Sequence, residues 1–273
     1  MSKALAVSHG EFGRAAVYEL DRTISTHAHR EGHLIFWIGG APADVQVGRE
    51  RFSCDGQMAT AVSPWAPHSF HAPHSEPCAC LVLYIKPMWF LEHAAKAEFS
   101  LAFGRARLQV TPQIASLVHL LAAGMLDDST QSGINGLLFE LAHHCYEVSW
   151  RGQRRPGFLS TRRGLSDFRV RRSQQLMREA LSTHPGMDAL ASEVGLSRPH
   201  FFRLFKEQTG VTPNLYFNTL RSEAAIDDLM SSDKSITDIG FDLGFASQAS
   251  FTRFFSLNVG ISPTDYRRVA HLH

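Results

Sequence analysis

The side chains best suited to chemistry are histidines in the first third of this 273-residue chain. His27, His29 and His33 are spaced by even numbers of residues, so on one extended strand they would point to the same face. His68 follows the turn-forming segment PWAP, and six of the chain's 15 histidines lie between residues 27 and 74. Because neutral imidazoles bind Zn, Ni and Fe ions, these four residues form a candidate metal site. The alternatives are that they contact an organic effector or are buried structural residues.

Aromatic side chains flank these histidines in the sequence. Trp37 and Trp65, like Phe36 and Phe70, belong to residue types that most often pack in a core. Ligand pockets are also lined mainly by apolar and aromatic groups, with a few polar ones. We therefore assign Trp37 and Trp65, together with the four histidines, to a candidate effector site.

A second group of metal-ligand residue types follows directly. His71, His74, Cys78 and Cys80 would suit a zinc site of thiolates and imidazoles. However, the segment around the two cysteines has the pattern of a buried strand, in which cysteine is a small core residue. We favour packing for this group.

A repeat in the last third of the chain indicates a different chemistry. The segment GLSRPHFFRLFKEQTGVTP, starting at Gly195, matches GFASQASFTRFFSLNVGISP, starting at Gly244. Arginine, glycine and proline recur 50 residues apart, at Arg203 and Arg253, Gly210 and Gly260, and Pro213 and Pro263. Each copy follows a short apolar helical pattern. Each therefore predicts a helix, a tight turn containing glycine, and a second helix that enters the DNA major groove.

In each second helix, aromatic side chains bury one face: Phe201 and Phe205 in the first copy, Phe251 and Phe255 in the second. The opposite face is left to read bases, because arginine can form paired hydrogen bonds with guanine and glutamine with adenine. A solvated helix face is the alternative, but two copies at a constant spacing favour DNA reading. The candidate DNA-binding residues are Arg198, Pro199, Phe202, Arg203, Lys206, Gln248, Ala249, Thr252 and Arg253.

A helix-like segment from Asn214 to Met230 joins the two copies. A helix of that length spans about 25 Å. With its flanking turns, it approaches the roughly 34 Å that separates successive major-groove turns on one face of DNA. The two second helices are thus expected to reach two neighbouring half-sites.

The residues before the repeat show two kinds of apolar spacing, one typical of strands and one typical of helices. Short apolar runs at residues 33–38, 58–62 and 80–85, separated by glycine, proline and aspartate, predict strands of an antiparallel barrel or sandwich. From Thr111 the apolar spacing becomes helical and predicts two helices separated by the segment DDSTQSG. The second, from Ile134 to Trp150, has a further apolar stripe suited to pairing two subunits.

The segment 150–172 is rich in arginine and glycine and marks a domain boundary. We expect an effector-binding and dimerisation domain over residues 1–150, a linker over 151–165, and a DNA-binding domain over 166–273. The expected fold class is α+β, with an N-terminal antiparallel β-barrel and helical dimerisation segment, followed by an all-α domain with two helix-turn-helix units.

Composition sets bounds on the class of protein. The net charge of +1 argues at first against nucleic-acid binding, but the two parts of the chain differ in net charge. Residues 1–160 hold 13 basic and 14 acidic side chains, and the rest holds 14 and 12. Four cysteines are too few for a disulfide scaffold, which favours reduced thiols in a cytoplasmic protein. No segment resembles a signal peptide or a membrane helix.

Residues from about 165 to 270 resemble the DNA-binding domain of the AraC/XylS family of bacterial transcription regulators. The resemblance rests on the repeat, on "ITDIGFDLGF" and on "FTRFFSLNVGISPTDYRR". It implies seven helices, binding to promoter DNA and contact with RNA polymerase, with activation the commoner mode. Phe202 stands where the family usually presents a polar residue, so the first unit is expected to contact a thymine methyl or the backbone.

The segments THAHREGH and SPWAPHSFHAP resemble the two histidine motifs of the cupin barrel, in which an H-x-H pair and a later histidine converge on a metal. His33 stands near the place of the family's Glu or Gln. The front half also resembles the sensor domains of AraC-type regulators, most of which bind a small organic effector. This resemblance implies a cupin-like barrel that binds an effector and a homodimer.

The leading hypothesis is therefore an effector-responsive regulator that is not an enzyme. One alternative is a metal-sensing regulator that uses the histidines. Another is a cupin metalloenzyme with a DNA-binding tail, whose iron site would need Glu31 or Asp44 in phase with two histidines. A pH sensor using the same histidines is a third alternative.

Overall fold

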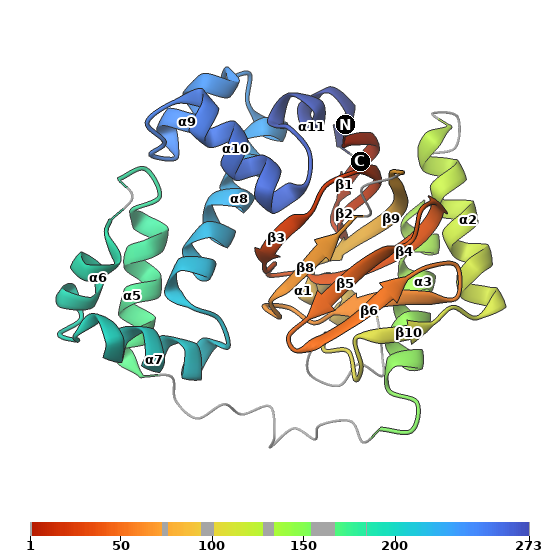
Figure 1. The fold of residues 1–273 in the computed structure, drawn as a ribbon, viewed down its shortest axis with the longest axis horizontal. Coiled ribbons are helices and arrows are strands. Elements are labelled where there is room, and N and C mark those ends of the chain that lie inside the picture. Colours follow the sequence, from red (N-terminus) through yellow and green to blue (C-terminus); the bar gives the residue numbers. More distant parts are fainter. Residues whose placement is uncertain are drawn as a thin grey trace.

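The structure is a computed structural model that describes residues 2–72, 76–93, 101–127, 134–153, 167–183 and 185–272. Strands dominate the first part of the chain and helices the last part (Figure 1). The predicted linker lies outside the described residues except for residues 151–153.

Two sheets build the N-terminal part. One has seven strands in the order β10-β7-β4-β9-β2-β1-β11, and the other has four in the order β3-β8-β5-β6. The first consists of β1 (Lys3–Gly10), β2 (Gly13–Leu20), β4 (Gly32–Gly40), β7 (Met58–Val62), β9 (Cys78–Ile85), β10 (Arg107–Gln109) and β11 (Ala270–Leu272). The second consists of β3 (Ile24–His27), β5 (Ala43–Val47), β6 (Glu50–Cys54) and β8 (His68–His71).

The two sheets face each other across a shared apolar core. Ile35 and Val82 of the larger sheet pack with Val45 and Phe70 of the smaller one, and all four are buried. Except for the pair of β1 with β11, the pairings are antiparallel. The predicted antiparallel barrel is thus confirmed, in the form of a flattened barrel of two sheets.

Helices cover the outer face of the larger sheet. They are α1 (Pro87–His93), α2 (Pro112–Leu126) and α3 (Ile134–Ser149). Strand alternation explains the second core beneath them, because Ala15 and Val17 point to the helices while Ala16 and Tyr18 point into the barrel. The hydroxyl of Thr111 caps α2 by accepting from the Ile114 amide at 3.2 Å, where the sequence places the start of a helix.

Seven helices form the C-terminal part in the described residues. They are α5 (Phe168–Glu179), α6 (Met187–Glu193), α7 (Arg198–Thr209), α8 (Pro213–Ser231), α9 (Ile236–Asp242), α10 (Gln248–Val259) and α11 (Pro263–Val269). The joining helix α8 is within one residue of its predicted bounds at each end. It runs between the helix pairs α6–α7 and α9–α10 (Figure 1).

The two parts of the chain share a core and a sheet. The last strand, β11, pairs in parallel with β1, with Val7 opposite Ala270, so the C-terminal end extends the larger sheet (Figure 1). Phe251 and Phe255 of α10 belong to the same continuous buried cluster as the residues between the two sheets. The sequence did not predict this union.

Among the described residues, no helix combines the length and the apolar character that a membrane crossing needs.

Candidate functional site

The two predicted helix-turn-helix units are present. The first consists of α6 and α7, and the second of α9 and α10. Gly195 and Gly244 stand in the two turns with φ of 69° and 74°, a left-handed backbone that glycine adopts without steric cost. The repeat therefore reflects two copies of the same turn.

Each second helix buries its aromatic face and exposes the other. Phe201 and Phe205 on α7, and Phe251 and Phe255 on α10, have no exposed surface. Of the predicted reading residues, Phe202 and Thr252 are half-buried, and seven are exposed: Arg198, Pro199, Arg203, Lys206, Gln248, Ala249 and Arg253. Seven of the nine are therefore accessible to a partner, and their role in reading bases stays a prediction.

Two of these side chains are held by the first helix of their own unit. The guanidinium of Arg198 donates to the carboxylate of Asp188 on α6 at 2.8 Å. The hydroxyl of Thr237 on α9 donates to the Gln248 amide oxygen at 2.7 Å. Arg203 and Arg253 make no ion pair with any described residue and so present their guanidinium groups directly to solvent.

The reading face of α10 borders a cleft that also includes the sensor part of the chain. The cleft has a volume of about 740 Å³ and is lined by α10 residues and by Arg22, which lies between β2 and β3. Among the described residues that line it, none is acidic. Arg253 gives this cleft a positive character, and Arg22 adds to it although its Nε lies 3.7 Å from a carboxylate oxygen of Asp21. Nothing in the sequence pattern pointed to Arg22.

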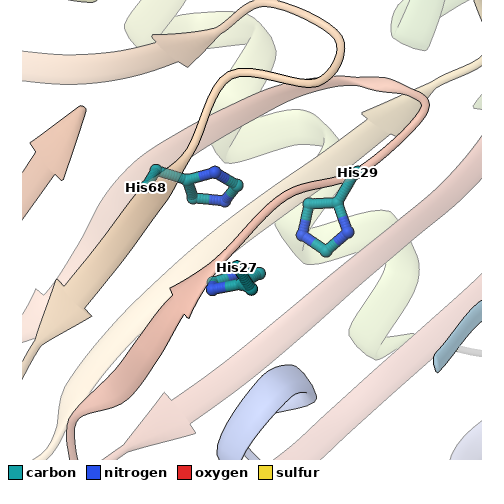
Figure 2. A group of neighbouring side chains, drawn as sticks. All are labelled: His27, His29 and His68. Carbon is teal, nitrogen blue, oxygen red and sulfur yellow. The ribbon is translucent and has the colours of Figure 1, made fainter. Parts of the chain in front are cut away.

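The four predicted histidines converge inside the barrel. Ligand atoms of His27, His29 and His68 lie within 4.8 Å of one another. Figure 2 shows the three rings grouped together. The ring centroid of His33 lies 4.9 Å from that of His68. The expectation that three of them share one strand is wrong, because β3 ends at His27 and β4 begins at Gly32. His29 lies in the intervening loop, where its carbonyl accepts from the Trp65 amide at 2.7 Å.

Backbone carbonyls fix the tautomers of two of these rings. The Nδ1 atoms of His27 and His68 lie 2.7 Å and 3.0 Å from the carbonyl oxygens of Ser25 and Ala66. Because a carbonyl oxygen only accepts, each Nδ1 carries the hydrogen and each Nε2 presents a lone pair. The Nδ1 of His33 lies 3.0 Å from the Nε2 of His68, so His33 donates to it. The Nε2 atoms of His29 and His33 are buried without a hydrogen-bond partner among the described residues.

The imidazoles of the cluster are neutral at pH 7. Burial lowers the pKa of His27 to about 4. Burial is also the main cause that places the pKa values of His29, His33 and His68 well below their usual range. Neutral imidazole is the form that binds a metal ion.

A small cavity adjoins the cluster. Its volume is about 20 Å³, and its walls include His27, His33 and His68 from the barrel and Asn258 and Val259 from α10. The recognition helix of the second unit thus closes the cavity. Asn258 and Val259 were missed by the sequence analysis, because they lie at the apolar end of α10 and no motif marks them.

Neither predicted tryptophan lines this cavity. The Trp37 indole donates to the Gly40 carbonyl at 3.2 Å, beside the barrel core. Trp65 has φ of 64°, and its ring stacks on that of Tyr216 of α8, with centroids 4.8 Å apart. Trp65 therefore joins the two parts of the chain rather than the cavity wall.

The packing predicted for the second group fits the structure. Cys78 and Cys80 are buried in β9, with free thiols. His71 lies at the end of β8, and His74 lies outside the described residues.

The loop that carries His29 also contacts the DNA-binding part. Between the inward-facing His27 and His29, the carbonyl of Ala28 accepts from the Thr219 hydroxyl of α8 at 3.0 Å. Arg30 forms an ion pair with Glu223, also on α8. One short segment therefore faces the histidine cluster on one side and the joining helix on the other.

A buried cation forms a second contact between the two parts. The guanidinium of Arg14 lies 3.6 Å from the centroid of the Tyr84 ring and donates to the Tyr266 hydroxyl of α11 at 3.2 Å. The same hydroxyl lies 2.7 Å from Nε2 of His9. Burial raises the pKa of Tyr266 to about 12, so this hydroxyl keeps its hydrogen at neutral pH.

Comparison with known protein families places both parts of the chain. A family described as AraC-like ligand binding domain matches residues 8–142, and one described as helix-turn-helix domain matches residues 190–269. The two matches lie on either side of the predicted linker.

Among curated proteins, the MmsAB operon regulatory protein of Pseudomonas aeruginosa is 38% identical over 92 residues, which are 34% of this chain and 30% of that protein. The HTH-type transcriptional activator RhaS of Escherichia coli is 40% identical over 81 residues, 30% of this chain and 29% of that protein. The chain thus matches less than a third of the length of either relative.

The crystal structure of unsaturated fatty acid bound ToxT from Vibrio cholerae has the same fold. It covers 93% of this chain and 94% of its own, with a TM-score of 0.58 and 14% sequence identity. The order of barrel, helical pair and helix-turn-helix units is therefore shared along nearly the whole chain.

Proposed function

Since this chain belongs to the AraC family, we propose that it is an effector-responsive regulator of transcription that binds specific promoter sequences. The observation that carries the proposal is the pair of second helices, α7 and α10, which bury their phenylalanines and expose arginine and glutamine. Each presents side chains that discriminate bases in the major groove. The regulatory names of the relatives support the same function.

The barrel supplies the effector site of this regulator. The histidine cluster adjoins a small cavity inside the barrel, and α10 closes this cavity. A ligand with different affinity for two arrangements of this wall would shift the population of DNA-binding arrangements. We propose that the chain acts in this way as an activator, in the cytoplasm, where promoter DNA and RNA polymerase are found, and that it is not an enzyme.

We further propose a homodimer formed through the helical pair. On α3, Ile134, Leu137 and Phe139 are half-buried against the core of the same chain. The exposed apolar side chains of the pair are Leu120 and Leu126 on α2, at 52% and 54% exposure. We therefore extend the predicted dimer surface from α3 to both helices. Sedimentation of the wild type and of Leu120→Glu tests it, since a dimer through this surface dissociates in the variant.

Selection of bound duplexes from a random DNA pool tests the function without knowledge of the target. The proposal expects an enriched motif with two blocks about one helical turn apart, one for each unit. Binding without any enriched sequence would contradict sequence-specific regulation, because contacts to phosphates alone do not select sequence.

A further inference from the structure

Part of the histidine cluster lacks hydrogen-bond partners among the described residues. His27 and His68 turn their Nδ1 hydrogens outward to backbone carbonyls, and the Nε2 atoms of His29 and His33 have no partner in the described chain. A buried ring nitrogen without a hydrogen-bond partner destabilises the fold. A cation that binds the available ring lone pairs would offset this cost.

The outward hydrogen bonds are the arrangement found around metal-binding histidines. Such a histidine usually donates its other ring hydrogen to a carbonyl or carboxylate, which fixes the tautomer and the ring orientation. Ser25 and Ala66 supply these carbonyls for His27 and His68.

The dimensions also fit an ion better than an organic molecule. Pockets for organic ligands usually enclose about 300–1,000 Å³, whereas this cavity has a volume of about 20 Å³, close to the space that one water requires. The three candidate ligand atoms already lie within 4.8 Å of one another. Three imidazoles leave a further coordination position open, as in zinc sites that bind an additional ligand.

We propose that His27, His29 and His68 bind one divalent transition-metal ion, and that this ion is the effector sensed by the chain. The effector role of the ion rests on the function proposed above, whereas the binding of the ion does not. His33, which donates to His68, competes with the ion for the Nε2 lone pair. Imidazole ligands select ions such as Zn²⁺, Ni²⁺ and Co²⁺ over Mg²⁺ and Ca²⁺, which prefer oxygen.

The metal half is tested on the full chain after treatment with a chelator. Titration calorimetry with Zn²⁺, Ni²⁺ and Co²⁺ in separate experiments should show one ion per chain, and Mg²⁺ and Ca²⁺ should give no signal. His29→Gln should weaken binding on the order of 100-fold. It should still fold, because the His29 Nε2 has no hydrogen bond to lose, and far-UV circular dichroism checks this. His119→Gln, an exposed histidine on α2, is the matched control and should bind normally.

The effector half is tested by the affinity for the duplex selected from the pool, with and without Zn²⁺. We expect the ion to change this affinity by about 5- to 150-fold in the wild type and not in His29→Gln. Absence of binding, or equal binding by His29→Gln, overturns the site. An ion that binds but leaves the DNA affinity unchanged overturns the effector role only. Loss of DNA binding in every state contradicts the proposed function and leaves the site intact.

Discussion

The carbonyl oxygen of Ala28 accepts a hydrogen bond from the hydroxyl of Thr219, 191 residues away, at 3.0 Å. Ala28 stands between His27 and His29, and Thr219 lies on the helix that joins the two DNA-binding units. We expect that the ion proposed above would shift this loop and, through this bond, α8. Coupling between the histidine cluster and the DNA-binding helices is demonstrated when a change in one connecting element alters both sites.

Thr219→Val tests the route. The variant keeps the shape of the side chain and loses the hydroxyl, which also lies 3.0 Å from the Leu215 carbonyl of its own helix. We expect a loss of about 1 kcal/mol in the free energy of unfolding, together with a smaller effect of Zn²⁺ on DNA affinity. Ser231→Ala, which loses only a bond within α8, should leave the Zn²⁺ effect unchanged. An identical Zn²⁺ effect in Thr219→Val would exclude this bond as the route.

The close contact of α10 with the barrel can be measured by comparing two glycines. Gly260 and Gly210 end the second helices of the two units, with φ of 92° and 83°. A Cβ at Gly260 would lie 2.7 Å from Cδ1 of Ile24 on β3, whereas one at Gly210 would meet nothing within 4 Å. Alanine at either position carries the cost of a left-handed backbone, about 1–2 kcal/mol.

Urea unfolding should therefore show a larger loss of stability for Gly260→Ala than for Gly210→Ala. The difference between the two losses in the free energy of unfolding measures the contact between α10 and the sensor barrel. Equal losses in the two variants would mean that the barrel and α10 do not pack against each other in solution.

Much of this architecture follows from the sequence. The repeat located both helix-turn-helix units because its aromatic and arginine positions follow helical spacing in two copies. The run Met58–Val62 matches β7 residue for residue, since a short apolar run between turn-forming residues marks a buried strand. These features are local, so a pattern along the chain contains them.

Features that depend on distant partners were not predictable in this way. Strand β11 has three residues and no pattern of its own, and it forms because the edge of β1 offers backbone groups to pair. The sequence analysis assigns Trp65 to the effector site because it precedes His68. In the structure, Trp65 has a positive φ and its ring stacks on that of Tyr216 instead. His29 joins the cluster from a loop, so the two-residue side-chain alternation of a strand could not predict its position.

Arg22 is predicted to contribute to DNA binding from the sensor domain. It shares the cleft with Arg253 and with the base-reading face of α10, and a phosphate backbone beside the major groove would enter such a cleft. Arg22→Ala should weaken binding to all duplexes alike and reduce the slope of log affinity against log salt by about 1. Arg107→Ala, an exposed sensor arginine on β10, should change neither. Unchanged affinity and slope in Arg22→Ala would place the DNA away from this loop.

Base-specific contacts by the two units are the central claim, and binding to the selected duplex by Arg203→Ala and Arg253→Ala tests it most directly. Fluorescence anisotropy should show that each variant loses affinity by about 5- to 150-fold, corresponding to about 1–3 kcal/mol for a paired contact with a base. Each should also lose its preference for bases in one block of the motif only, because α7 and α10 read separate half-sites. Unaltered affinity and unaltered preference in both variants would contradict the account.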